Sequence, residues 1–391
     1  FTSFETATLS ANASVTMSES QHDAFGTING NSGTEAITLN TANGDGNVTG
    51  DADIETYNLN GAFTFTLGAA GQSVTGNADA DQTVQSSASI DTLTGTLNGG
   101  TGGSDTLVLD TGDNIAGATV SNFENLTLGS GASVSMTAAQ LGSFTGTVTA
   151  AGTETITLTA TGNASGADIS AIETIATAGG SSAQTVTLTA AQAAGKTLTA
   201  ADTGLDHFII TGSTGNQTIA GSAGADTIDG GTGADTLSGA GGADVLTGAD
   251  VFVGGGGNDN FIGEADDFNG DTISGLAAGD VITINSVDLS ALGGTTLGST
   301  IDMGDARILN LSDAASNLTI SASTNGGNTV LTFAAPTPPS SGGGNSGGGS
   351  SGPVVVTDNP ADTSTGGART ITNNGSTSGS AAIVQNTGNN G

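Results

Sequence analysis

Aspartate recurs at a fixed interval in a stretch that is otherwise glycine, alanine and small polar residues. GSAGADTID, GGTGADTLS and GAGGADVLT follow one another without a gap from residue 221, and GADVFV and GGGGNDNFI follow from residue 248. Each unit carries one carboxylate before its large apolar residue: Asp226, Asp235, Asp244, Asp250 and Asp259. No Lys or Arg lies within this stretch. These carboxylates must therefore find their counter-charge outside the polypeptide.

The nonapeptide spacing predicts which aspartates lie together. Each unit divides into a six-residue turn, where glycine permits positive φ, and a three-residue strand whose single large residue points inward. Two units make one coil of eighteen residues, which places Asp226 and Asp244 on one side and Asp235 on the other. Carboxylates stacked at strand spacing, about 4.8 Å, repel strongly unless a divalent cation lies between them. Carboxylates with glycine carbonyls form the flexible all-oxygen environment that favours calcium over magnesium.

The run resembles the GGxGxDxUx repeat of the RTX, or hemolysin-type calcium-binding, family, whose repeats form a parallel β-roll. The resemblance implies Ca²⁺ as cofactor and the five aspartates as side-chain ligands. It also implies four turn glycines whose neighbouring carbonyls assist: Gly224, Gly233, Gly242 and Gly257. Asp250 follows Asp244 by six residues rather than nine, so the strict register breaks there. The alternative interpretation is a set of plain glycine-rich turns with solvated aspartates.

Composition and charge restrict the fold and the partners. The 391 residues include 66 Gly, 37 Asp and Glu against 3 Lys and Arg, no Trp and no Cys. Few large side chains, many Thr and Val, and almost no helical pattern predict an elongated all-β fold with a thin core. The net charge of −34 excludes nucleic acid and anionic membranes as partners and favours cations. No apolar run approaches the length of a membrane helix.

Internal similarity predicts tandem modules before the roll. FETATLSANASVTMSES from residue 4 aligns with FENLTLGSGASVSMTAA from residue 123, an offset that TEAITL and TETITL repeat. Degenerate copies of the nonapeptide occur at GNADADQTVQ from residue 76 and at GGTGGSDTLVL from residue 99. We expect two Thr/Gly-rich β modules, stacked or sandwich-like, then a calcium-binding parallel β-roll and a closing β segment. The predicted ranges are 1–98, 99–210, 211–265 and 266–334, then a Pro/Gly/Ser linker at 335–353 and an incomplete domain or tail at 354–391.

Other candidate residues carry weaker signals. His22 and His207 are isolated, and we interpret both as surface or strand-end residues. Glu264, Asp266 and Asp267 could hold one more ion at the end of the roll or form a solvated turn. AAQAAGKTL from residue 190 approaches a phosphate-binding loop, but the equivalent places of the sister copies have no lysine. We find no nucleophile or metal dyad, and expect no enzyme.

These features favour a secreted structural protein. Calcium modules outside cells typically bind at about 10⁻⁴ to 10⁻³ M, so the roll should fold where calcium is plentiful. The composition is similar to that of RTX-bearing bacterial surface-layer proteins, which implies a surface-layer or matrix component that self-associates. The alternatives are a calcium-dependent adhesin, with a cell-surface glycan as partner, and the non-catalytic part of a secreted hydrolase. Because the chain begins at Phe1, we expect a processed form or a segment of a larger protein.

Overall fold

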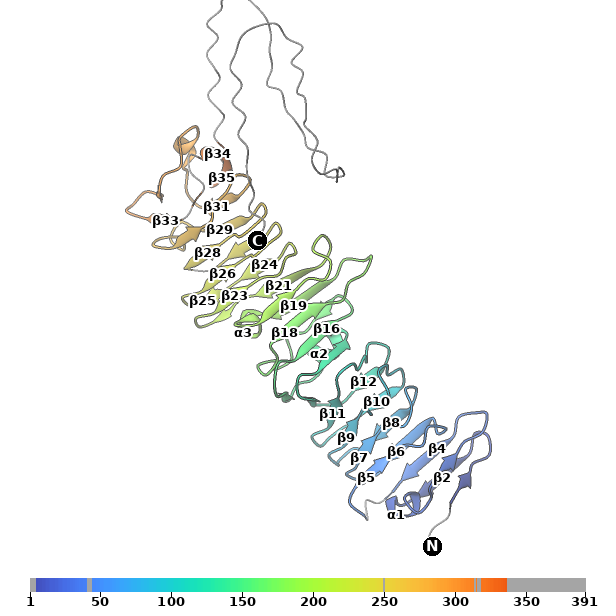
Figure 1. The fold of residues 1–391 in the computed structure, drawn as a ribbon. Helices are drawn as coiled ribbons and strands as arrows, with labels where there is room; N and C mark the ends of the chain where they lie inside the picture. Colours follow the sequence, from blue (N-terminus) through green and yellow to red (C-terminus); the bar gives the residue numbers. More distant parts are fainter. Residues whose placement is uncertain (1–4, 41–43, 249, 313, 315–317, 336–391) are drawn as a thin grey trace, which may run out of the picture. The chain divides into compact units, whose positions relative to one another are not determined.

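Short strands follow one another along the chain, and each pairs with strands of the neighbouring coils. The computed structural model describes residues 5–40, 44–248, 250–312, 314 and 318–335. These strands build a parallel β-solenoid of about 13 turns, in which the coils stack in sequence order (Figure 1). Of the two units of the chain, residues 1–336 contain all the described residues, so the predicted domain or tail at 354–391 lies outside them.

The first half of the solenoid has two facing parallel sheets and the start of a third. One sheet contains β2 (Ser14–Met17), β4 (Ala36–Leu39), β6 (Thr56–Leu59), β8 (Ser73–Gly76), β10 (Thr96–Asn98) and β12 (Thr119–Ser121). A second contains β5 (Asn47–Thr49), β7 (Thr64–Thr66), β9 (Thr83–Gln85), β11 (Thr106–Leu109), β13 (Asn125–Leu128) and β15 (Val148–Thr149). A third contains β14 (Ser133–Met136), β16 (Thr155–Leu158), β18 (Thr174–Thr177) and β20 (Thr197–Thr199). A short pair, β1 (Ala7–Thr8) and β3 (Ile28–Asn29), precedes them.

Two further sheets carry the remaining coils. One contains β17 (Gly162–Asn163), β19 (Thr185–Thr189), β21 (His207–Thr211), β24 (Thr227–Asp229), β27 (Val245–Thr247), β29 (Asn260–Glu264), β31 (Val281–Asn285), β35 (Asn328–Ala334) and β34 (Thr319–Asn325). The other contains β23 (Thr218–Ala220), β26 (Thr236–Ser238), β28 (Val251–Val253), β30 (Thr272–Ser274), β33 (Ile308–Ser312) and β32 (Thr300–Asp302). β22 (Ser213–Thr214) pairs with β25 (Gly231–Thr232). Pairing through β21 joins the second predicted module to the roll.

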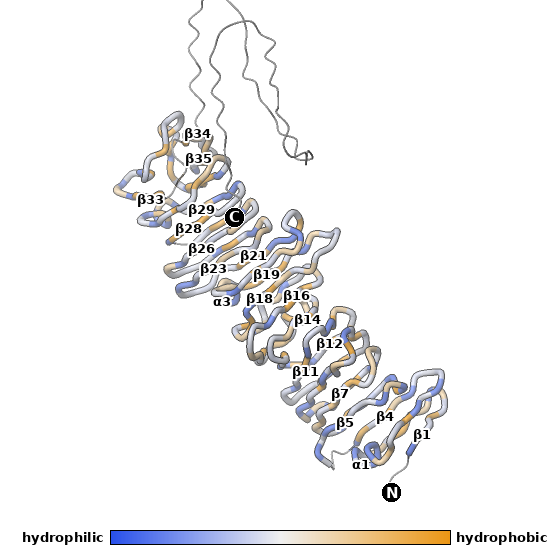
Figure 2. The backbone as a smooth tube through the Cα atoms, in the orientation of Figure 1, coloured by the Kyte–Doolittle hydropathy of each residue, from blue (hydrophilic) through white to orange (hydrophobic). Residues whose placement is uncertain are grey.

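Alternation within each strand forms the thin core. In β16, for example, Ile156 and Leu158 are buried while Thr155 and Thr157 are partly exposed. The same alternation of hydrophobic and hydrophilic residues follows the strands in Figure 2. Thr and Val suit this arrangement because branched side chains pack well on a pleated surface. The all-β prediction is confirmed, and the modules that the sequence left as stacked or sandwich-like are stacked coils.

The 119-residue offset also separates helical turns α1 and α2, and a third turn of the same kind, α3, follows later in the chain. Helix α1 (Glu19–His22) follows β2, α2 (Ala138–Gly142) follows β14, and α3 (Ala190–Ala193) follows β19. Each begins with a Ser or Thr cap and a glutamine three residues later that completes a capping box. The Nε2 atom of Gln140 donates to the carbonyl oxygens of Ile115 and Ala118, which ties the turn to the preceding coil.

Parallel stacking ends at an antiparallel cap. β35 pairs antiparallel with β31 and forms a hairpin with β34, and β32 pairs antiparallel with β33. The short 3₁₀ turn η1 (Ser290–Leu292) precedes this hairpin. The hairpin covers the last parallel edge of its sheet. Without it, the unpaired N–H and C=O groups of that edge could pair with a strand of another chain. No helix in the described part of the chain is long and apolar enough to cross a membrane.

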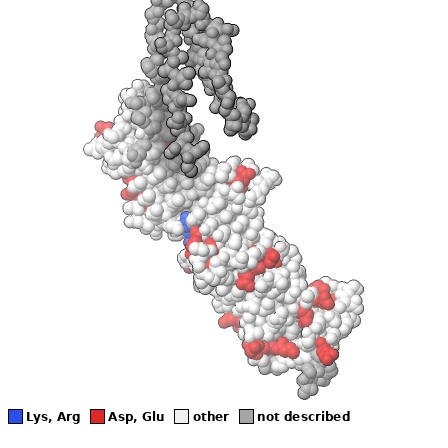
Figure 3. All heavy atoms as spheres, in the orientation of Figure 1, with Lys and Arg blue, Asp and Glu red and all other residues white. Residues whose placement is uncertain are grey.

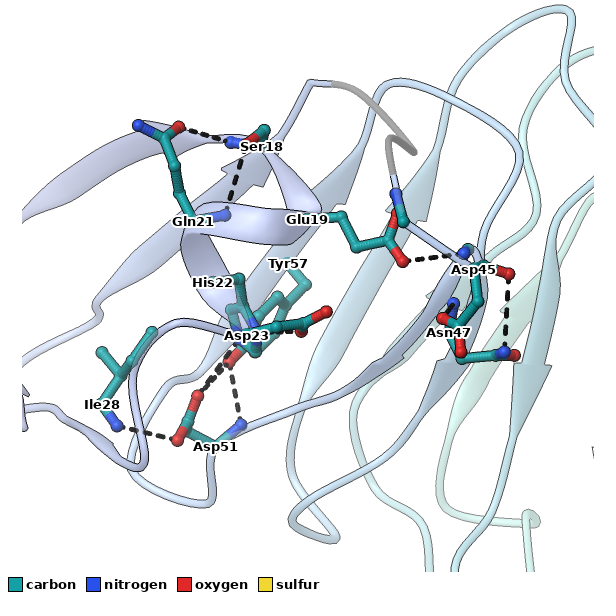
Figure 4. A network of polar contacts seen from close by, with 12 residues as sticks. Ser18, Glu19, Gln21, His22, Asp23, Ile28, Asp45, Asn47, Asp51 and Tyr57 are labelled. Atoms are coloured by element: carbon teal, nitrogen blue, oxygen red, sulfur yellow. Dashed lines mark hydrogen bonds and ion pairs between the residues drawn. The ribbon is translucent and has the colours of Figure 1, made fainter. Parts of the chain in front are cut away.

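His22 departs from the sequence interpretation, because it is buried on α1 rather than at the surface or a strand end. Its Nε2 atom lies 3.2 Å from Asp51 Oδ2, and its ring meets Tyr57 edge-on. Figure 4 shows the three side chains converging beneath the helix. Burial works to raise the pKa of Asp51, but hydrogen bonds from His22 and from the N–H of Ile28 bring it below its usual value. His207 lies at the start of β21, as predicted.

Replacing Tyr57 with Phe should destabilise this end of the solenoid. The Tyr57 hydroxyl accepts a hydrogen bond from the N–H of Asp51 at 2.9 Å, and that donor would lose its buried partner. We expect a loss of about 1–2 kcal/mol in the free energy of unfolding, measured by urea denaturation followed by circular dichroism. Thr127→Val, which removes an outward-facing hydroxyl from β13, is the control. Equal midpoints for both variants would contradict this role of Tyr57.

Candidate metal centre

The repeat aspartates occupy one structural position, immediately before a short strand. Asp226, Asp244 and Asp259 precede β24, β27 and β29, which are neighbours in one sheet. Asp235 and Asp250 precede β26 and β28 in the other sheet. The predicted geometry, with Asp226 and Asp244 on one side of the coil and Asp235 on the other, is therefore confirmed.

Each of these strands is as short as the nonapeptide predicts, and the core residue is the expected one. β24, β26, β27 and β28 have three residues each. The central residue of each strand is buried, and Phe261 in β29 follows the same pattern: Ile228, Leu237, Leu246, Phe252 and Phe261. This narrow core fixes the spacing of the coils and so holds the carboxylates in register.

Backbone hydrogen bonds link the carboxylates into two ladders. On the first side, the N–H of Asp226 donates to Asp244 Oδ1 at 2.7 Å, and the N–H of Asp244 donates to Asp259 Oδ1 at 3.0 Å. On the second side, the N–H of Asp235 donates to Asp250 Oδ2 at 3.1 Å. One oxygen atom of each accepting carboxylate is thus hydrogen-bonded to the backbone of the preceding coil. In Asp235 and Asp244, the second oxygen remains for another ligand.

Two of those second oxygens are buried without a hydrogen-bond partner. Asp235 and Asp244 are each 1% exposed, and the Oδ2 atom of each accepts no hydrogen bond. Asp226 differs, because its Oδ2 atom accepts from the N–H and hydroxyl groups of Ser222. A buried carboxylate oxygen without a donor is costly unless a proton or a cation meets it.

The turn glycines let each turn pack closely against the backbone of the preceding coil. Gly233, Gly242 and Gly257 have φ values of +138°, +113° and +137°, which L side chains rarely adopt. Gly224 has no positive φ, and it is required by close packing instead, since a Cβ there would overlap the carbonyl oxygen of Asp206. All four predicted turn positions therefore need glycine, although for two different reasons.

The shortened unit closes a smaller coil instead of interrupting the stack. The separation within the hydrogen-bonded pairs shows the difference. It is 15 residues for Asp235 and Asp250 and for Asp244 and Asp259. For Asp226 and Asp244 it is 18 residues. A cavity of about 380 Å³ lies beside this coil, and its lining includes Asp250, Asp267 and Asp271. The ladder continues through the register break, with an acidic cavity next to it.

Sequence reasoning missed two members of the ladders, Asp280 and Asp206, whereas Gln217 stands in the degenerate unit GSTGNQTIA at the position of the repeat aspartates. Asp280 accepts from the N–H of Asp259 at 3.0 Å, and Asp206 accepts from the N–H of Gln184 at 3.0 Å. On the second side, the N–H of Gln217 donates to Asp235 Oδ1 at 2.7 Å. The usable signal is an acidic or amide residue immediately before a strand, as in DVITI, DHFII and QTIA. A search at a fixed period of nine reaches Gln217, nine residues before Asp226, but not Asp206 or Asp280.

The acidic residues at 264–267 divide between two roles. Arg307 donates to Asp266 Oδ1 at 3.0 Å, so Asp266 has a counter-charge within the chain. The N–H of Glu264 donates to Asp267 Oδ2 at 3.2 Å, and Asp267 also lines the acidic cavity. A closed turn accounts for Asp266, while Asp267 faces the space beside the shortened coil.

Burial makes these carboxylates hard to ionise. It raises the pKa of Asp244 to about 7, with the charges of Asp226 and Asp259 adding to the rise. Burial also raises the pKa of Asp226 and of Asp259. In the acidic cavity, burial together with Asp250 and Asp267 raises the pKa of Asp271 to about 6. The sites favour a proton unless a cation replaces it.

Asp244 should therefore give the calcium-free chain an unusual pH dependence. Its folded pKa of about 7 lies above the unfolded value of 3.8, so the folded state holds the extra proton between these limits. Stability from this group is present below pH 4 and is lost as pH rises towards 7, at most ~1.4 kcal/mol per pH unit. Chemical denaturation in EDTA from pH 4.5 to 6.0, where the proton on Asp244 still stabilises the calcium-free fold, measures this slope. Asp244→Asn should flatten it, and equal slopes would refute the assignment.

The donor set fits a hard cation completed by backbone oxygens. Among the described residues, no three His, Cys, Asp or Glu side chains converge on one point. The carboxylates instead lie singly on successive coils, beside turns that expose glycine carbonyls. Calcium accepts such mixed oxygen ligands in flexible geometry. Asp235 and Asp244, with the neighbouring turn carbonyls, would hold it.

Comparison with known proteins identifies this segment. Residues 211–246 and 247–267 match the RTX calcium-binding nonapeptide repeat, in four copies. Neither the comparison with curated proteins nor that with solved structures gave a match. These residues are RTX repeats, and their metal is Ca²⁺.

Proposed function

We propose that this chain is a secreted structural protein of the bacterial cell surface, a surface-layer or matrix component, that calcium folds and assembles. The observation that carries the proposal is the ladder of buried aspartates in a chain with a net charge of −34. Inside a cell, where calcium is scarce, such a ladder repels itself and the roll stays open. Outside, bound calcium neutralises the ladder and closes the coils.

The regular coils favour a structural role over a catalytic one. Coils of short parallel strands repeat along the solenoid, with Thr side chains at the partly exposed positions of strands such as β16 and β19. Asp and Glu form several patches on the face in Figure 3, where Lys and Arg are nearly absent. Two such surfaces repel each other unless divalent ions bridge them, so the same calcium that folds the roll would permit contact between copies.

Assembly in calcium tests this proposal. Purified full chain in EDTA should remain unassembled, and addition of millimolar calcium should produce ordered sheets or filaments visible by negative-stain electron microscopy. Magnesium at the same concentration is the control, because its stricter octahedral geometry suits these sites poorly. A chain that folds on calcium addition but stays strictly monomeric would contradict the structural role while leaving calcium-dependent folding intact.

A further inference from the structure

A glutamine and an aspartate outside the matched repeats form a buried pair in the first half of the solenoid. Gln82 immediately precedes β9 and Asp105 immediately precedes β11, and these strands pair in parallel. Gln82 is 1% exposed and Asp105 is 0% exposed. The pair occupies the same place before a strand as the aspartates of the RTX repeats.

Each side chain of this pair has one oxygen atom without a partner. The N–H of Gln82 donates to Asp105 Oδ1 at 2.7 Å, but Asp105 Oδ2 accepts no hydrogen bond. The Nε2 atom of Gln82 donates to the carbonyl oxygens of Gly61 at 2.7 Å and Ala80 at 3.2 Å, which fixes the orientation of the amide. Its Oε1 atom is buried and accepts no hydrogen bond. Two buried acceptors without donors point to a missing cation.

The same arrangement exists inside the RTX segment, at Gln217 and Asp235. There too the glutamine N–H donates to the aspartate Oδ1 at 2.7 Å, and Gln217 Oε1 and Asp235 Oδ2 have no partner. The glycine before each aspartate also matches. A Cβ on Gly99 would lie 2.8 Å from Asp105 Oδ2, and a Cβ on Gly230 would lie 2.8 Å from Asp235 Oδ2. In both coils, a glutamine and an aspartate immediately before paired strands each keep one buried oxygen atom without a partner, and a glycine lies against the free aspartate oxygen.

The surroundings of Asp105 supply negative charge. Burial raises the pKa of Asp105, and the charges of Glu124 and Asp81 add to the rise. The basic side chains in the described part of the chain act elsewhere, since Lys196 donates to the carbonyl oxygen of Ile172 and Arg307 pairs with acidic residues near the cap. A cation from solution is the available counter-charge.

We propose that the coil closed by Gln82 and Asp105 is a further calcium site, outside the RTX segment. Asp105 Oδ2 and Gln82 Oε1 are its side-chain ligands, and backbone carbonyls of the 99–103 turn complete it. Carboxylate, amide and carbonyl oxygens are the ligands that calcium takes in proteins. The inference rests on the proposed function, because it takes calcium to close coils in the first half of the solenoid as it closes those of the roll.

Hydrogen exchange of the full chain, read by mass spectrometry with Ca²⁺, with Mg²⁺ and in EDTA, tests both proposals at once. We expect calcium, and not magnesium, to slow exchange at least tenfold in peptides covering 76–105 and in those covering 221–260. Protection of 221–260 without protection of 76–105 would overturn the further site and leave the roll intact. Absence of protection in both segments would overturn the proposed function as well.

Matched variants separate this site from general stabilisation. Asp105→Asn should remove calcium protection at 76–105 and keep it at 221–260. Asp113→Asn is the control, because Asp113 is also buried but its Oδ2 already accepts hydrogen bonds from Ser86 and from the N–H of Asp110. Gln82→Glu, which adds a charged ligand, should lower the calcium concentration needed for protection at 76–105. Equal behaviour of Asp105→Asn and Asp113→Asn, or no effect of Gln82→Glu, would overturn the site.

Discussion

At pH 7.5, where Asp244 no longer holds its proton, withdrawing calcium from the full chain is expected to unfold the RTX roll. Calcium modules outside cells bind at about 10⁻⁴ to 10⁻³ M, and free ion at ten times that constant adds ~1.4 kcal/mol per site. Several sites together reach the ~5–15 kcal/mol that stabilises a whole domain. Without the ion, buried carboxylates at Asp235 and Asp244 keep an oxygen with no partner. The coils around them then lose the free energy that closes them.

Thermal melts followed by far-ultraviolet circular dichroism measure this effect. In millimolar calcium, the chain should show a β spectrum and a melting transition well above that in EDTA, where part of the β signal should already be absent at 25 °C. Magnesium at equal ionic strength separates specific binding from general screening of the charge of −34. Superimposable melting curves in EDTA and in calcium would remove the physical basis of the proposed function.

The local architecture of the roll could be predicted because the nonapeptide has a fixed length. A constant period shows which residue of each unit points inward. Leu237 and Leu246 occupy that position, and both are buried as the period predicts. The charge imbalance then required an external cation. Both arguments use only local spacing and composition, so they hold wherever the repeat is intact.

The pairing of the residues outside the intact repeats could not be predicted, even where degenerate repeats were recognised, because the coils vary in length. The paired ladder residues Gln82 and Asp105 are 23 residues apart, whereas Asp235 and Asp250 are 15 apart. Turns and strands both vary in length from coil to coil, so no single period joins these residues. The burial of His22 was also unpredictable, because it depends on Asp51 and Tyr57, which reach α1 from later coils.

Replacing Asp235 and Asp244 together with Ala should nearly abolish the calcium response. Asp244 serves one ladder and Asp235 the other, so the pair of changes removes an oxygen ligand on each side of the coil. It also leaves two buried N–H donors, those of Asp226 and Gln217, without their acceptors. Each such orphan costs ~1–3 kcal/mol, in addition to ~1.4 kcal/mol for each calcium site lost. We expect the calcium midpoint for folding to rise by at least tenfold.

Calcium titration followed by circular dichroism measures that midpoint. The control, Asp288→Ala with Asp302→Ala, removes the same number of negative charges but from exposed positions. It should leave the calcium midpoint within twofold of that of the parent chain. Asp235→Asn with Asp244→Asn separates the two contributions, since an amide oxygen can still accept the N–H of the preceding coil but carries no charge. If the variant with Asp235→Asn and Asp244→Asn kept the calcium midpoint of the parent chain, the two aspartates would serve only to hydrogen-bond neighbouring coils. The metal would then bind elsewhere.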